Sequence, residues 1–184
     1  SMSKAVEKGE FEPYLQFVVD RAGTVVGAET VSRWQNPEEG LLMPSKYIDL
    51  MIRAGTITEL DLYMLRCACV QLQTWKREGR GTLWLSCNFT RQSIADEKIL
   101  ARVHEIVEQY DFTRDRLVVE LTEDSYAHDR EAALRTIEGL HAMGLRIVLD
   151  DIGAGYSSLS DLSTYPIDGV KIDFPAEWVH LRKS

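Results

Sequence analysis

Short apolar runs alternate with longer segments of helical periodicity along most of the chain. The runs have the length and β-branched content of buried strands, and we expect strands at 13–20, 24–31, 82–87, 116–121, 145–150 and 168–172. The segments between them space apolar residues three and four apart, which predicts helices at 44–54, 58–78, 93–110, 128–143, 156–163 and 175–183. Strands that alternate with helices predict an α/β fold, with a parallel sheet and helices outside it.

The first two strands depart from this alternation. Asp20-Arg21-Ala22-Gly23 separates them and predicts a hairpin turn, so we expect this pair to be antiparallel. Residues 35–43 contain Asn-Pro and Gly and predict a loop. Thr58 and Asp61 match the pattern of a helix N-terminal cap. The sequence shows no linker, which predicts one domain over 3–184, with Ser1-Met2 as an expression remnant.

Polar residues of one chemical kind stand where the predicted strands end. Asn88, Glu120, Asp150 and Lys171 follow one another at steps of 32, 30 and 21 residues, and a strand-plus-helix unit takes roughly 30 residues. The ends of parallel barrel strands converge on one face, where catalytic residues gather. Glu29 and Asp151 belong to the same set, which holds four carboxylates, a carboxamide and a lysine. This set predicts a site for hard divalent cations.

The amino-acid composition limits the classes of molecule that the protein is expected to bind. The 184 residues carry a net charge of −8, which disfavours binding to DNA and to anionic membrane. A phosphate ligand can still bind where metal ions supply positive charge. No apolar run approaches the roughly 20 residues of a membrane span, so we expect no membrane insertion and a cytoplasmic location. The cysteines Cys67, Cys69 and Cys87 match no zinc pattern and are expected to be reduced, buried thiols.

Six short motifs in a fixed order resemble one known family. GAETVSRW at 27–34 is similar to the signature of the EAL phosphodiesterase domains, which hydrolyse the bacterial second messenger cyclic di-GMP. The other five motifs occur in the family's order: PYLQ at 13–16, SCNFT at 86–90, ELTE at 120–123, DDIGAGYSSL at 150–159 and KID at 171–173. The resemblance covers about residues 11–173.

The resemblance implies a modified TIM-type (β/α) barrel whose first strand is antiparallel. It implies hydrolysis of cyclic di-GMP to linear pGpG with two Mg or Mn ions, in a homodimer. It also implies attachment to sensor or GGDEF domains in a larger signalling protein that could be membrane-attached. The family pattern continues past KID with two further strands, one of which carries another metal-binding glutamate. This chain ends 11 residues after Asp173, so we expect a barrel that is incomplete at its C-terminus.

The resemblance also assigns roles to individual residues. The implied metal ligands are Glu29, Asn88, Glu120, Asp150 and Asp151. Lys171 would contact the attacking water and, with Glu29, count as catalytic. Gln16 and Arg33 resemble residues that contact the guanine or phosphate of the ligand. Glu123 resembles the carboxylate that holds the loop after Asp151, and Gly153 and Gly155 give that loop backbone freedom. Asp150 and Asp151 would both reach the metals if a loop begins at Asp151.

Several residues depart from the family pattern and keep other functions open. Glu-Thr-Val replaces Glu-Ala-Leu, so Val31 is a smaller side chain near the ligand, and Ile152 and Ala154 alter the following loop. These departures favour a non-catalytic receptor or protein-interaction domain as the alternative to an enzyme. A hydrolase of another phosphodiester is a third reading. Binding without turnover would indicate the receptor, and competition by unrelated cyclic nucleotides would indicate the third.

Overall fold

The computed structural model describes residues 2–122, 125, 129–152, 167–172 and 182–183. Its helices are α1 (Met2–Glu7), α2 (Ile48–Arg53), α3 (Ile57–Arg77), α4 (Arg91–Ala95), α5 (Ile99–Val107) and α7 (Arg130–Ala142). Its strands are β1 (Phe11–Val19), β2 (Val25–Asn36), β3 (Gly40–Leu42), β4 (Trp84–Phe89), β5 (Leu117–Thr122), β6 (Arg146–Ile152), β7 (Gly169–Ile172) and β8 (Arg182–Lys183). Single turns of 3-10 helix occupy Pro44–Lys46 and Arg114–Arg116.

The strands form one sheet in the order β7-β6-β5-β4-β2-β1-β8, with β3 attached to β2. The ladder from β2 through β7 is parallel, whereas β1 runs antiparallel to β2, as predicted. The connecting turn is held by Asp20, whose carboxylate accepts the N–H groups of Ala22 and Thr24 at 2.9 and 3.0 Å. Across the described residues the sheet does not close on itself, so the fold is an open form of a TIM-type barrel.

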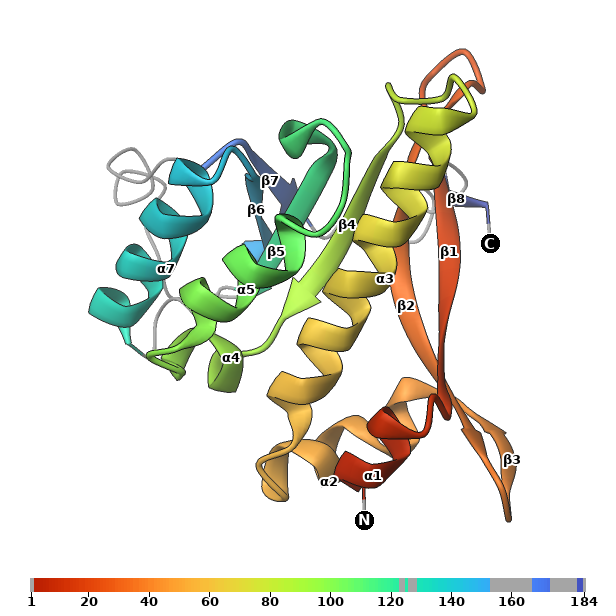
Figure 1. Cartoon of the computed structure of the whole chain (residues 1–184), viewed down its shortest axis with the longest axis vertical. Helices are drawn as coiled ribbons and strands as arrows, with labels where there is room; N and C mark the ends of the chain where they lie inside the picture. The colour runs from red at the N-terminus through yellow and green to blue at the C-terminus, as the bar shows by residue number, and fades with distance from the viewer. Residues whose placement is uncertain (1, 123–124, 126–128, 153–166, 173–181, 184) are drawn as a thin grey trace.

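The two faces of the sheet have different chemistry because side chains alternate along each strand. Helices α3, α4, α5 and α7 cover one face (Figure 1). Buried strand residues such as Leu85, Leu121 and Leu149 pack there against helix residues such as Leu65 and Ile137. Each leucine or isoleucine fully buried in this layer contributes roughly 1.5–3 kcal/mol. The same alternation leaves the polar residues at the strand ends on the opposite, concave face.

A second, smaller cluster closes the end of the β1–β2 hairpin. The Phe11 ring lies 5.5 Å from the Trp34 ring and 5.3 Å from the Tyr47 ring, centroid to centroid. The Tyr47 hydroxyl shares a hydrogen bond of 2.8 Å with the Ser32 hydroxyl, which satisfies the polar end of a fully buried side chain. These contacts fix the backbone on both sides of Arg33.

Two predicted segments differ in detail. Residues 35–43 were expected to form a loop, but Gly40–Leu42 pairs with β2 as strand β3. The helix predicted at 93–110 is divided into α4 and α5. Asp96 adopts an extended conformation between them, and its carboxylate accepts the Lys98 N–H at 2.9 Å. A short polar side chain thus competes for the backbone donor and ends the first helix.

The predicted cap and the predicted last helix are also corrected. Helix α3 begins at Ile57 with Thr56 at its N-cap, so Thr58 lies inside the helix. Arg182–Lys183 pairs with β1 as strand β8, which contradicts a helix that extends through 183. The helix expected at 156–163 lies outside the described residues.

Candidate functional site

The strand register brings the predicted metal ligands to one face of the sheet. Glu29 on β2 pairs with Ser86 on β4, and Asn88, two residues further along, pairs with Glu120 on β5. Thr122, two residues beyond Glu120, pairs with Asp150 on β6. Directly paired residues of parallel strands project to the same side, and so do residues two apart on one strand. Glu29, Asn88, Glu120 and Asp150 therefore share the concave face.

These four residues also lie at the same height. Relative to the direct partner of the ring residue on the preceding strand, the ring residue is shifted by two residues on β4, by none on β5 and by two on β6. Barrel strands tilt by about 36°, so a ring of constant height climbs on average about one residue per strand. Only every second residue of a strand faces this side of the sheet. An average climb of about one residue per strand therefore appears as alternating shifts of zero and two residues. The predicted ligands thus form one ring near the C-terminal ends of β4, β5 and β6, whereas β2 continues to Asn36, seven residues beyond Glu29.

The chemistry of this ring fits a hard divalent cation. Glu29 and Glu120 are 7% and 3% exposed, Asp150 is half-buried and Asn88 is exposed. Buried carboxylates are costly unless they are paired or bind a metal, and all four side chains offer the oxygen ligands that Mg and Mn prefer. Among the described residues, no three Asp, Glu, His or Cys side chains by themselves make a metal cluster. Asn88 and further oxygen donors would have to complete the coordination.

A backbone irregularity lies at the two adjacent aspartates. Leu149 pairs with Val170 and Ile152 pairs with Ile172, so Asp150 and Asp151 stand opposite Lys171 alone. Two residues opposite one define a β-bulge, a feature that is frequent beside active sites because it bends the strand. A loop was expected to begin at Asp151, but β6 continues through Ile152. The register thus brings the Lys171 backbone beside both aspartates.

The β1–β2 hairpin supplies the two predicted ligand contacts. Gln16 pairs with Glu29, and Arg33 follows Glu29 by four residues on the same face. The Arg33 guanidinium donates to the Ser32 carbonyl at 2.8 Å and lies 5.5 Å from the centre of the Tyr14 ring. Tyr14 stands between Gln16 and Arg33 on this face, and its cation–π contact restrains the guanidinium. Sequence reasoning missed this tyrosine.

A pocket of about 310 Å³ opens beside Asn88, between β2, α2 and α3. Val31, the position at which the sequence departs from Glu-Ala-Leu, is part of its wall. The wall also contains Pro44, Ile48, Leu60 and Met64. A valine here leaves room that a leucine would fill.

Asp61 anchors the segment that follows Asn88. Its carboxylate accepts the Thr90 N–H at 2.8 Å, the Thr90 hydroxyl at 2.9 Å and the Ser93 hydroxyl at 2.6 Å. Burial raises the pKa of Asp61 to about 6, despite the opposing effect of these hydrogen bonds. The sequence pattern predicted a helix cap at Asp61. The role seen in the structure was missed because the hydrogen-bond partners of Asp61 lie 29 to 32 residues away in the chain.

This elevated pKa predicts a pH-dependent stability term. The native chain holds the Asp61 proton up to about pH 6, whereas the ordinary pKa of an aspartate carboxyl is 3.8. The unfolded state therefore binds fewer protons between these values, and stability falls as pH rises through that window. At about 1.4 kcal/mol per pKa unit, the loss is on the order of 3 kcal/mol. Asp61→Asn should remove that dependence while keeping an acceptor for Thr90, as measured by urea unfolding from pH 4 to 7. Parallel pH profiles for the two proteins would contradict it.

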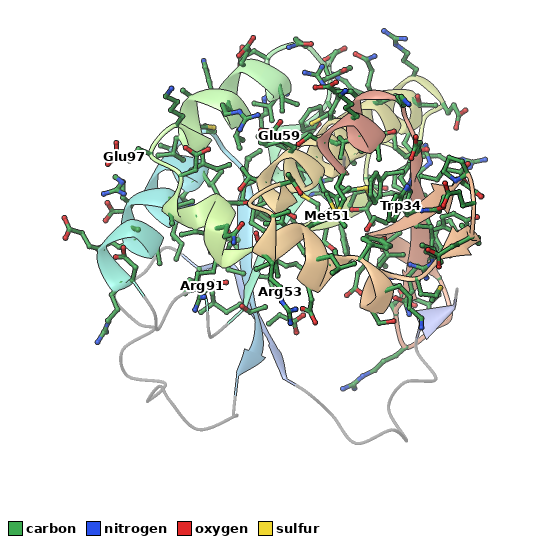
Figure 2. The ribbon with its side chains drawn as sticks, turned by 90° about the horizontal axis from the view of Figure 1, so that it is seen from below. Trp34, Met51, Arg53, Glu59, Arg91 and Glu97 are labelled. Carbon is green, nitrogen blue, oxygen red and sulfur yellow. The ribbon has the colours of Figure 1, made fainter. Side chains whose placement is uncertain are left out.

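The edge at which β2 and β4 end also carries two exposed arginines. Figure 2 views this edge and shows Arg53, from the end of α2, beside Arg91, at the start of α4. The two helices are tied together there because the Gln92 side-chain amide donates to the Ile52 carbonyl at 2.7 Å. These guanidinium groups place positive charge at one rim of an acidic chain.

Other predicted features have separate outcomes. Cys67, Cys69 and Cys87 are free thiols, and burial raises the pKa of Cys69 to about 12 and that of Cys87 well above its usual value. The predicted burial is confirmed for Cys69 and Cys87, whereas Cys67 is only partly buried. Glu123, Gly153 and Gly155 lie outside the described residues, so their roles stay predictions.

The sequence profile of the EAL domain matches residues 1–174. The chain belongs to the EAL domain family. Its relatives include cyclic di-GMP phosphodiesterase PdeR of Escherichia coli K12, 31% identical over 173 residues, which make up 94% of this chain and 26% of PdeR. Another is MucR of Pseudomonas aeruginosa, a bifunctional diguanylate cyclase/cyclic di-GMP phosphodiesterase. It is 31% identical over 151 residues, covering 82% of this chain and 22% of MucR.

A solved EAL structure has the same fold. The PaMucR phosphodiesterase in complex with c-di-GMP superimposes with a TM-score of 0.87 at 29% identity, covering 94% of this EAL chain and 70% of the other. This confirms the TIM-type fold class. The chain spans about a quarter of the length of PdeR and of MucR.

Within the described part of this EAL chain, no helix combines the length and apolar character needed to cross a membrane.

Proposed function

We propose that this EAL domain hydrolyses cyclic di-GMP to linear pGpG with the help of two Mg or Mn ions. The observation that carries the proposal is the ring of Glu29, Asn88, Glu120 and Asp150, which the strand register holds at one height on the concave face. The names of PdeR and MucR as cyclic di-GMP phosphodiesterases support the choice of substrate.

The residues divide into ligand-binding and metal-binding roles. We assign the metals to Glu29, Asn88, Glu120, Asp150 and Asp151. Two ions held by these residues would supply an activated water and charge stabilisation for an in-line displacement. Gln16 and Arg33, at the edge of the same ring, would bind and orient the cyclic dinucleotide. Arg33 suits this role because its planar guanidinium can donate two hydrogen bonds to a phosphate.

The reaction is balanced by one water molecule. A water oxygen forms a bond to phosphorus, the bond from phosphorus to a ribose 3′ oxygen breaks, and that oxygen receives a proton. Lys171, opposite the bulge, would contact the attacking water and add positive charge to the developing negative oxygen. Glu123, Gly153 and Gly155 would position the loop that follows Asp151.

The wider family properties are proposals for the whole protein. We infer a homodimer, and attachment to sensor or GGDEF domains would place the catalytic unit under regulation. The bifunctional name of MucR supports a cyclase partner in such proteins.

The test is turnover of cyclic di-GMP with Mg or Mn by this chain and by a longer form extended at its C-terminus, with Glu29→Ala as the blank. We expect pGpG from the longer protein at least, and none from the Glu29→Ala form. Calorimetric titration with cyclic di-GMP runs in parallel. Binding without turnover in both lengths would reject the enzyme and indicate the receptor. Displacement by unrelated cyclic nucleotides would indicate a different phosphodiester substrate.

A further inference from the structure

The Ser86 hydroxyl is buried without a hydrogen-bond partner. Ser86 is 1% exposed, and its Oγ is the single buried side-chain polar atom that finds no partner within the described residues. An unsatisfied buried hydroxyl destabilises the fold, because it loses its bonds to water and gains none in return. Such a group in a native protein indicates a missing water, ion or functional partner.

The other buried hydroxyls in the part of the chain that the structure describes have hydrogen-bond partners, so the exception is local. Thr30 donates to the Ser86 carbonyl, Ser93 donates to Asp61 at 2.6 Å, and Thr136 donates to the Ile94 carbonyl at 3.4 Å. The Thr30 bond ties the Ser86 backbone to β2, next to the paired positions of Glu29 and Ser86. Ser86 is therefore fixed in the sheet and has no ready path to solvent.

The position of Ser86 indicates what its partner is. It pairs directly with Glu29 and stands two residues before Asn88, so all three share the concave face. It thus lies one layer below the ring of predicted ligands. Metal-binding side chains are commonly oriented by hydrogen bonds from a surrounding group, and such groups tune metal affinity.

We propose that Ser86 is a positioning residue of the metal centre, an inference that rests on the proposed function. With a divalent cation bound, its hydroxyl donates to an oxygen of that centre, either the Glu29 carboxylate or a water held beside it. A hydrogen bond to an ionised or metal-polarised oxygen is stronger than one between neutral groups. The unsatisfied hydroxyl of the metal-free chain thereby becomes a favourable contact in the metal-bound chain.

The proposal predicts opposite effects of one substitution on two measurements. Ser86→Ala removes an unsatisfied polar group, so the thermal unfolding midpoint of the metal-free chain should stay equal or rise. The same change removes the support of the metal centre, so the Mn concentration that gives half of the metal-induced rise in midpoint should increase 10- to 100-fold. Neither readout requires turnover.

Two variants serve as controls. Thr136→Val removes a buried hydroxyl that has a partner, far from the ring on helix α7, and should lower the metal-free midpoint without changing the Mn titration. Glu29→Ala should abolish the Mn response. A Ser86→Ala chain that matches the wild type in its Mn titration, while Glu29→Ala does not, would overturn the role of Ser86 alone. A wild-type chain without any Mn response would instead contradict the metal centre, and the inference with it.

Discussion

Replacing Glu120 with glutamine is expected to lower metal-dependent hydrolysis of cyclic di-GMP by at least about 100-fold, since loss of a group that only supports a metal ligand already costs 10- to 100-fold. Glu120 is 3% exposed and stands level with Asn88 in the centre of the ring. Glutamine keeps the size of the side chain but removes its negative charge, which is the feature a divalent cation selects. The rate of pGpG formation at saturating Mn measures the effect.

The fold should survive this change, so the loss can be assigned to chemistry. Volume-conserving substitutions in a core cost little, and the neutral amide is easier to bury than a carboxylate. Glu138→Gln, on the exposed face of α7, makes the same chemical change outside the ring and should leave turnover unaltered. Full activity of Glu120→Gln would remove this residue from the metal centre.

The placement of the ring could be predicted from sequence because it depends on local signals. Each predicted ligand ends an apolar run, and runs that alternate with helices imply parallel strands whose ends meet at one edge. The hairpin turn at Asp20 could also be predicted from neighbouring residues, since one carboxylate organises the turn. Glu29, Asn88, Glu120 and Asp150 were therefore found together without knowledge of the register.

What sequence reasoning missed depends on pairing between distant segments. Asp61 finds its partners 29 and 32 residues away, and nothing beside it in the chain distinguishes it from a helix cap. The bulge at Asp150-Asp151 is defined by how β6 pairs with β7. The lack of a hydrogen-bond partner for the Ser86 hydroxyl depends on which groups surround it in the folded sheet. These features are properties of three-dimensional packing, which the order of residues along the chain does not reveal.

Gly27 controls how closely β2 approaches β4, and Gly27→Ala should destabilise the chain by about 3 kcal/mol, the upper range for overpacking a core. A Cβ at this position would lie 2.3 Å from the Trp84 ring and 2.6 Å from the Trp84 carbonyl oxygen. The ring could turn aside, but the carbonyl belongs to the paired strand and cannot move alone. The thermal midpoint should fall by roughly 6–12 °C for a chain of this size.

The same substitution should impair the site, because Glu29 is two residues from Gly27 and takes its register from the β2–β4 ladder. We therefore expect weaker Mn binding together with lower stability. Gly81→Ala is the matched control, since its Cβ would meet only ordinary contacts of 3.7–3.9 Å with Lys76. If Gly27→Ala unfolds at the same temperature as Gly81→Ala, β2 and β4 must be free to separate, and the close approach at Gly27 does not fix Glu29 beside Ser86.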